Sequence, residues 1–288
     1  MEVPGERSPG MRNFIFLHRY NDFPVKTDEP TMIITLSPSK GQEFETPGPV
    51  KKHSKPADLK DSELLIKELR KIKPAGLQAL MDISNDLASL NVGRYKAFKT
   101  PFTAKNSKQA IFAFKGDVYS GIDIDTFTAD DFDYAQNHLR ILSGLYGCLR
   151  PLDLIHPYRL EMKTRLKNPR GENLYQFWGD SITGSLNKAL KKQQEPVLVN
   201  LASNEYFRSV KPKLLEGRLL NINFKETKQG KTRVVAIFAK RARGMMADYI
   251  IRNRIKSPAA IKKFKQGGYR FSKELSDDKQ WTFERPQP

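Results

Sequence analysis

Hydrophobic and polar residues follow two different periods along this chain, and the pattern predicts interleaved strands and helices. Short apolar runs predict buried strands at residues 33–36, 110–119 and 196–203. Apolar residues spaced three or four apart predict helices at residues 61–98, 129–143, 172–193, 204–213 and 238–256. Because the two kinds of element alternate without internal repeats or a clear linker, we expect one mixed α/β domain with a mixed sheet.

Cap and breaker residues set the ends of several helices. Pro74 and the region of Ser84 are expected to interrupt the first long helical stretch. Thr128 is placed as an N-cap, with aspartates in the first turn that follows it, and we expect that helix to end before Gly144.

The C-terminal third is expected to contain two β-hairpins and the most basic helix. One hairpin turns at residues 228–231 and leads into helix 238–256, and the other occupies residues 267–285. The apolar stripe of this helix, which we expect to be buried, comprises Ala242, Met245, Met246, Tyr249 and Ile250. The basic residues that flank the stripe are Lys240, Arg241, Arg243, Arg252 and Arg254. A continuous helix would superpose Arg241 on Arg252, and Arg243 on Arg254.

Two interpretations of these arginines remain open. Long arginine side chains often cover the rim of a core and keep their charged ends in water, and Asp248 is spaced to pair with Arg252. Alternatively, the arginines form a cationic wall that binds an anionic partner.

The charge balance favours the second interpretation. The 288 residues include 50 Lys and Arg against 32 Asp and Glu, a net charge of +18 and a pI of about 9.8. Residues 205–270 alone hold 18 basic and 4 acidic residues, whereas residues 116–134 hold six Asp and no Lys or Arg. This segregation predicts a basic side and a polyanionic partner, with nucleic acid favoured over membrane.

Several classes of protein are disfavoured by the composition. Cys148 is the sole cysteine, so an intramolecular disulfide is impossible and a reducing compartment is expected. The four histidines show none of the usual metal-ligand spacings, and we expect no metal site or cofactor. Without a long apolar segment or a convincing signal peptide, a cytoplasmic monomer is expected. We interpret residues 1–31 as an appendage, disordered or produced by an upstream translation start, and residues 32–288 as the folded domain.

A candidate DNA contact lies within residues 77–92. The small and apolar residues there fit a helix-hairpin-helix, whose hairpin would present backbone N–H groups to a phosphate. Asp82 and Ser84 replace the two glycines usual in such a hairpin, so an ordinary helical turn is an equal alternative. The candidate DNA-binding residues of this region are Lys71, Lys73, Ser84 and Arg94.

Polar residues that follow predicted strands form a second candidate site. Ligands of α/β proteins bind at the carboxyl ends of strands, which favours a shared cleft for these side chains. The candidate cleft residues are Lys40, Lys115, Arg150, Tyr158, Arg159, Glu161, Asn200, Ser203, Glu205 and Tyr206. Glu161 and Glu205 are candidates for an acid–base pair, although the sequence does not give their separation.

Seven sequence blocks resemble, in order, the bacterial YaaA peroxide-stress protein family. The blocks are SPSK, KGDVY, HLRILSGLYGCLRPLDL, PYRLEM, LYQFWGD, NLASNEYF and AKRARGMM, within residues 32–283. The resemblance implies a cytoplasmic protein that protects against hydrogen peroxide by restraining free iron and oxidative damage. It also implies a single mixed α/β fold peculiar to the family, a positively charged cleft, a helix-hairpin-helix and DNA binding.

Three functions compete at this point. The first is sequence-tolerant binding of DNA, with duplex DNA expected, through phosphate contacts of the basic helix and the Ser84 region. The second is an enzyme that acts on a phosphorylated or nucleotide-like small molecule, which Lys40, Lys115, Arg159 and Glu205 would bind in a narrow pocket. The third is a module that binds an acidic protein.

Overall fold

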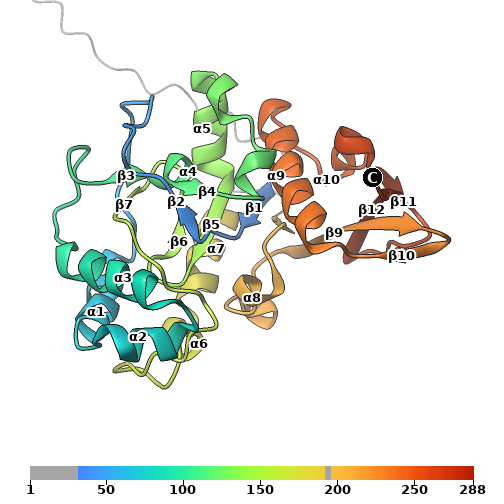
Figure 1. The fold of residues 1–288 in the computed structure, drawn as a ribbon. Coiled ribbons are helices and arrows are strands. Elements are labelled where there is room, and N and C mark those ends of the chain that lie inside the picture. The colour runs from blue at the N-terminus through green and yellow to red at the C-terminus, as the bar shows by residue number, and fades with distance from the viewer. Residues whose placement is uncertain (1–31, 192–195) are drawn as a thin grey trace, which may run out of the picture.

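The computed structural model describes residues 32–191 and 196–288 (Figure 1). The interpretation of residues 1–31 as an appendage falls outside these residues. The strands are β1 Met32–Leu36, β2 Gly41–Gln42, β3 Lys108–Gln109, β4 Phe114–Lys115, β5 Leu139–Ser143, β6 Gly147–Leu149, β7 Leu154–Ile155, β8 Val197–Asn200, β9 Arg218–Lys228, β10 Lys231–Arg233, β11 Arg270–Ser272 and β12 Gln280–Pro286.

Helices of very different lengths connect these strands. The α-helices are α1 Leu59–Leu69, α2 Pro74–Met81, α3 Asn85–Ala97, α4 Ala110–Ala113, α5 Ala129–His138, α6 Leu174–Trp178, α7 Ser181–Leu190, α8 Asn204–Phe207, α9 Ala236–Arg252 and α10 Pro258–Ile261. The 3-10 turns are η1 Tyr119–Gly121, η2 Ile124–Thr126, η3 Pro212–Leu214 and η4 Gln266–Gly268.

One large mixed sheet organises the domain. Its strand order is β11-β12-β9-β8-β1-β5-β6, and β10 pairs with β9. The five strands from β12 to β5 run parallel, whereas β11, β6 and β10 are antiparallel to their neighbours. Every residue of β1 and β8 is buried, which explains their continuous apolar sequences. The predicted single mixed α/β domain with two C-terminal hairpins is confirmed.

The helices occupy distinct regions around this sheet. In Figure 1, α1, α2, α3 and α6 gather at the lower left, while α9 and the β9–β12 region lie to the right. Helices α5, α7 and α9 each contact β1, and α5 also contacts α9. Residues that follow β1 and β8 lie beside α8 and the first turns of α9.

Several predicted element boundaries are wrong. Residues 110–119 do not form one strand: the chain makes the short helix α4, pairs briefly as β4 and turns at Gly116, whose φ is +133°. Residues 110–114 are buried throughout, and a short apolar run does not distinguish a strand from a helical turn. The helix capped by Thr128 ends at His138 rather than before Gly144, because residues 139–143 pair with β1 and β6 instead.

Two glycines bring η1 against α9. A Cβ atom on Gly244 would lie 1.8 Å from the carbonyl oxygen of Val118, and one on Gly121 would lie 2.3 Å from that of Arg241. Neither position has room for a side chain, so the two backbones approach directly. This contact fixes the loop that carries Asp117 and Val118 beside the first half of α9.

No helix in the described part of the chain is both long enough and apolar enough to cross a lipid bilayer.

Candidate functional site

A cleft lies at the carboxyl ends of the neighbouring parallel strands β1 and β8. Its cavity measures about 720 Å³, and residues that follow both strands line it, together with the β4–η1 loop and α9. Ser37 follows β1 and Ser203 follows β8. The Ser37 hydroxyl accepts a hydrogen bond from the Ser203 amide at 2.9 Å and contacts the Ser203 hydroxyl at 3.2 Å. These bonds join the two strand ends into one floor.

Buried polar groups support this floor from below. Asn200 accepts hydrogen bonds from the Thr35 hydroxyl at 3.2 Å and the Ala202 amide at 2.9 Å. Its own amide nitrogen donates to the Asn221 side chain at 2.9 Å. The Tyr119 hydroxyl donates to the Ser37 carbonyl oxygen at 3.1 Å. The predicted cleft residue Asn200 therefore positions the strand ends rather than lining the cavity.

Glu161 gathers the cations on one side of the cleft. Its buried carboxylate pairs with Lys40 at 3.0 Å and with Arg159 at 3.2 Å, and Lys163 lies 3.8 Å away. The chain turns at residues 162 and 163, where the Thr164 amide donates to the Glu161 carbonyl oxygen at 3.0 Å, and this turn keeps Lys163 close to Glu161. The charge of Glu161 is thus shared among these cations.

Glu205 and Tyr206 line the same cavity next to Lys163 and Glu161. A Glu205 carboxylate oxygen accepts a weak hydrogen bond from the Lys163 amide at 3.4 Å. Burial is the main cause that raises the pKa of the Tyr206 phenol well above its usual value, and the nearby Glu161 and Glu205 carboxylates add to it. Tyr206 therefore stays neutral and available as a hydrogen-bond donor.

The structure brings together most of the residues predicted for the cleft. Those that line the cavity are Lys40, Lys115, Glu161, Ser203, Glu205 and Tyr206. Tyr158 and Arg159 line a small adjoining hollow that shares Lys40, Glu161 and Tyr206. Arg150 is not among the residues that line either space, since its backbone and side chain bond to Asp153 at 2.8 and 3.1 Å.

The basic helix contributes to the cleft only through its first half. Lys240 and Arg243 line the cavity, while Arg241 points to solvent. Lys240 lies 3.5 Å from Asp117. The Arg243 Nε is buried and has no hydrogen-bond partner in the part of the chain that the structure describes. The sequence did not indicate that Arg243 faces the strand ends, because that orientation depends on the η1–α9 contact.

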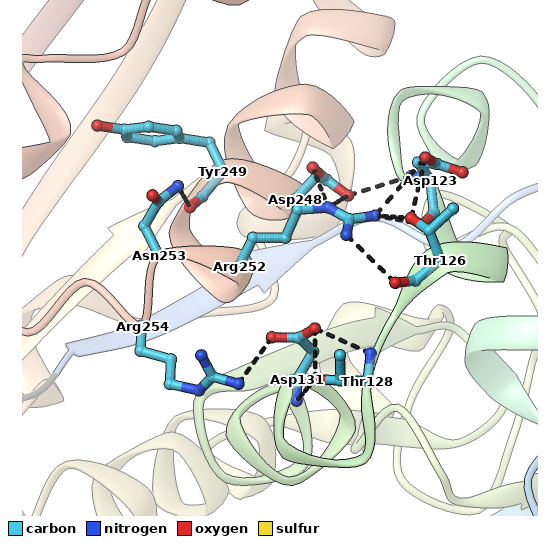
Figure 2. Close-up of polar contacts among 9 residues, drawn as sticks. All are labelled: Asp123, Thr126, Thr128, Asp131, Asp248, Tyr249, Arg252, Asn253 and Arg254. Atoms are coloured by element: carbon cyan, nitrogen blue, oxygen red, sulfur yellow. Dashed lines mark hydrogen bonds and ion pairs between the residues drawn. The ribbon is translucent and has the colours of Figure 1, made fainter.

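Arg252 and Arg254 lie in a different environment, which Figure 2 shows. The Arg252 Nε donates to both carboxylate oxygens of Asp248 at 3.1 and 3.0 Å, which confirms the predicted pair. Its guanidinium also donates to the Asp123 carbonyl oxygen at 2.5 Å and stacks 4.8 Å from the centre of the Phe127 ring.

The predicted superposition of Arg243 and Arg254 is wrong, because α9 ends at Arg252. Arg254 has a φ of +44° and points to the start of α5, where it pairs with Asp131 at 3.2 Å (Figure 2). The acidic stretch 116–134 thus lies against the basic helix, where Asp123 and Asp131 act as counterions. The acidic and basic stretches are therefore far apart in sequence but lie next to each other in the folded protein.

The helical stripe itself is as predicted. Ala242, Met246 and Ile250 are fully buried, and Met245 and Tyr249 pack against the core from its margin.

Helices α2 and α3 form around the predicted hairpin. Ser84 is the N-cap of α3 and accepts the Leu87 amide at 3.3 Å, while Asp82 takes a left-handed conformation with a φ of +51°. Lys71 pairs with Glu68 at 2.6 Å, and the half-buried Arg94 donates to Asn91 at 3.3 Å. The identity of this pair as a DNA-binding helix-hairpin-helix stays a prediction.

The α2–α3 pair and α9 do not form one patch. They lie in separate regions of Figure 1, with the sheet between them. The link between the pair and the cleft is Tyr95 of α3, whose hydroxyl donates to the Arg159 carbonyl oxygen. Arg94 adjoins this point, so the predicted DNA-binding residues fall into two groups on either side of the cleft.

Further polar residues line the cavity outside the predicted set, among them Ser39, Asp117 and Lys163. Lys163 reaches the cleft through the turn at residues 162 and 163, which the sequence pattern did not indicate. Among residues 32–191 and 196–288, no group of three or more His, Cys, Asp and Glu side chains is arranged to hold a metal ion.

Comparisons with known proteins assign the chain to a family. The family model described as "Peroxide stress protein YaaA" matches residues 32–275. The chain belongs to the YaaA peroxide stress protein family. Among its YaaA relatives, a UPF0246 protein of Ralstonia nicotianae is 53% identical over 88% of this chain and 99% of its own length. UPF0246 proteins of Teredinibacter turnerae and Paraburkholderia xenovorans are 49% and 52% identical, over 89% and 88% of this chain and 100% and 98% of their own lengths.

Membership of the YaaA family confirms the resemblance inferred from the seven sequence blocks. It gives the protein a general role in peroxide stress. Neither the family description nor the relatives' names state a ligand or a reaction.

Proposed function

We propose that this protein acts in peroxide stress by binding duplex DNA through phosphate contacts, without strong sequence preference. The proposed surface, called here the basic edge, runs from the β9–β10 hairpin to the first half of α9. It comprises Lys228, Lys231, Arg233, Lys240, Arg241 and Arg243.

The observation that carries this proposal is the close placement of like charges, of which only Lys240, 3.5 Å from Asp117, has a carboxylate partner among the described residues. Lys228 and Lys231 are directly opposed in the hairpin, an arrangement that is destabilising unless an anion approaches. Arg241 is exposed and has neither an ion pair nor a hydrogen bond within the described part of the chain. By contrast, Arg252 and Arg254 already have carboxylate partners, so we leave them out of the basic edge.

The α2–α3 pair supplies a proposed second contact. Lys73 and Ser84 precede the first turns of these helices, where backbone N–H groups favour a phosphate. Such contacts position a duplex without distinguishing its bases, which fits the absence of strong sequence preference in the proposal.

DNA binding also offers a way to limit damage by free iron. Cationic side chains that neutralise phosphates release the counterions condensed around DNA. Ferrous ions held at phosphates belong to that atmosphere, so the bound protein would displace iron from the site where peroxide converts it into a damaging oxidant. In this proposal the protein protects DNA without holding the metal itself.

A binding titration tests the proposal. Fluorescence anisotropy would measure the affinity of the wild type for two duplexes of unrelated sequence and for one single strand. We expect similar affinities for the two duplexes and a weaker complex for Arg243→Ala than for Arg252→Ala, since Asp248 already neutralises Arg252. Undetectable binding to every probe, or an equal loss in both variants, would contradict the proposal.

One observation favours an enzyme as a second candidate. Lys40, Lys115 and Glu205 line a single cavity, and Arg159 borders it through Glu161. An enzyme that acts on a phosphorylated or nucleotide-like small molecule requires such a convergence of side chains. DNA binding at the basic edge does not explain it.

A further inference from the structure

The strand-end cleft has the position and size of a small-molecule site. Its cavity of about 720 Å³ falls within the range of about 300–1,000 Å³ found for ligand pockets. Strand β1 has the parallel neighbours β8 and β5 on its two sides, and the chain returns across β1 to reach β8. Ligands of open α/β sheets bind beside the carboxyl ends of strands at such a reversal of strand order.

The floor of the cleft is built before any ligand arrives. The Ser37 hydroxyl is fixed by the Ser203 amide at 2.9 Å, and the Ser37 carbonyl oxygen is fixed by the Tyr119 hydroxyl at 3.1 Å. Gly116 lets the opposite wall approach, because a Cβ atom there would lie 2.7 Å from the Ser39 hydroxyl oxygen. A preformed site loses little entropy when it binds.

The balance of charge in the cleft calls for an anion. Five cations line the cavity against three carboxylates: Glu161 is committed to Lys40 and Arg159, Asp117 lies beside Lys240, and Glu205 accepts from the Lys163 amide. Arg243 and Lys115 also line the cavity, and neither forms an ion pair with a carboxylate of the described residues. A partly buried guanidinium without a counterion is costly, and an anionic group in the cavity would remove that cost.

The remaining wall calls for an apolar part in the same ligand. Val118, Val234 and Ala239 line the cavity next to these cations. Val234 is 55% exposed even though it is a large aliphatic residue beside a concave surface. A bound planar or aliphatic group would remove this apolar surface from water.

From these contacts we infer that the cleft binds one nucleotide-sized, phosphate-bearing molecule. Arg243 and Lys115 hold the phosphate, Val118, Val234 and Ala239 contact the base or sugar, and the Tyr206 hydroxyl donates a hydrogen bond. This function differs from DNA binding at the basic edge in its ligand and in its use of Lys115, while Arg243 belongs to both sites. The nucleotide comes either from the free pool or from a DNA strand, and both sources present the same chemistry.

Calorimetric titration with dAMP, adenosine and a short single-stranded oligonucleotide tests this inference. The variants are Arg243→Gln, Lys115→Gln and the matched control Arg241→Gln. The control removes an equal charge two positions before Arg243, and its side chain lies outside the cavity. We expect dAMP to bind the wild type and to lose at least about tenfold in affinity in Arg243→Gln and Lys115→Gln. Arg241→Gln should retain nearly full affinity for dAMP, and adenosine should bind far more weakly because it lacks the phosphate.

The two sources give different results. If dAMP fails to bind but the oligonucleotide binds with the same dependence on Arg243 and Lys115, the ligand is a nucleotide within DNA. If neither probe binds, or if Arg241→Gln loses as much affinity as Arg243→Gln, the inference is overturned and only a diffuse basic surface remains. Retained duplex binding in that case would leave the proposed function intact. Thermal unfolding of each variant shows that it is folded, and Lys115→Gln changes an exposed side chain that no fold contact requires.

Discussion

Replacement of Gly244 by alanine is the most direct test of how the cleft wall is positioned. The new Cβ atom would lie 1.8 Å from the Val118 carbonyl oxygen and 3.1 Å from the Gly121 Cα atom, and both belong to the backbone. Neither atom can move away as a flexible side chain would. Helix α9 and η1 must therefore separate, which loses packing around Val118 and shifts Asp117 away from Lys240.

The expected cost follows from two opposing effects. Overpacking a close contact costs about 1–3 kcal/mol, and a backbone clash belongs at the upper end of that range. Alanine in the interior of a helix recovers up to about 1 kcal/mol relative to glycine. We therefore expect a net loss of about 2 kcal/mol in the free energy of unfolding. For a domain of this size this corresponds to a decrease of about 4–8 °C in Tm.

Gly184 of α7 provides the matched control. It is also a helical glycine, but a Cβ atom there would meet nothing within 4 Å. Gly184→Ala should therefore leave Tm unchanged or raise it slightly. Circular dichroism during heating and urea titration measure both variants. If Gly244→Ala unfolds at the same temperature as Gly184→Ala, the close η1–α9 contact does not exist as described.

Two further predictions concern charge and reactivity. Arg252→Ala should cost about 2 kcal/mol at neutral pH, between the values for exposed and fully buried pairs, because Asp248 keeps a mostly buried carboxylate. Burial already raises the pKa of Asp248 above 3.8, and the loss of Arg252 raises it further. A folded-state pKa above the unfolded value means that stability falls as pH rises above 3.8, so the variant's deficit in urea titrations should be smaller in acid than at neutral pH. A deficit independent of pH would show that Asp248 is not its cause. Burial also raises the pKa of the Cys148 thiol to about 12, so iodoacetamide at about pH 8 should label it slowly in the native protein and rapidly in guanidinium chloride. Rapid native labelling would contradict that burial.

The sequence predicted the local elements of this fold better than their tertiary surroundings. Thr128 caps α5 through a reciprocal pair of bonds with Asp131, and the fully buried strands β1 and β8 were evident from their apolar residues. Residues 139–143 were assigned to a helix because their pairing with β1 spans more than a hundred positions, which local periodicity does not report. The break at Gly179, whose φ is +48°, divided another predicted helix into α6 and α7.

The candidate site shows the same division between local and long-range information. Polar residues after strands identified the cleft, because the carboxyl ends of parallel strands meet. The roles of the arginines were less accessible, since Arg243 faces the cavity and Arg252 faces Asp123 only because η1 and α5 pack against α9. The apolar stripe of a helix predicts which face is buried. It does not predict which residues contact the side chains on either side of the stripe.

The salt dependence of DNA affinity tests the central claim most directly. Each phosphate contact should contribute a slope of about −0.9 in log K against log salt concentration for duplex DNA. We predict a steep linear decrease for the wild type, and a slope shallower by about two units for the Arg241→Ala/Arg243→Ala double variant. An affinity that stays constant from low to moderate salt, or a double variant with the slope of the wild type, would contradict phosphate binding by the basic edge.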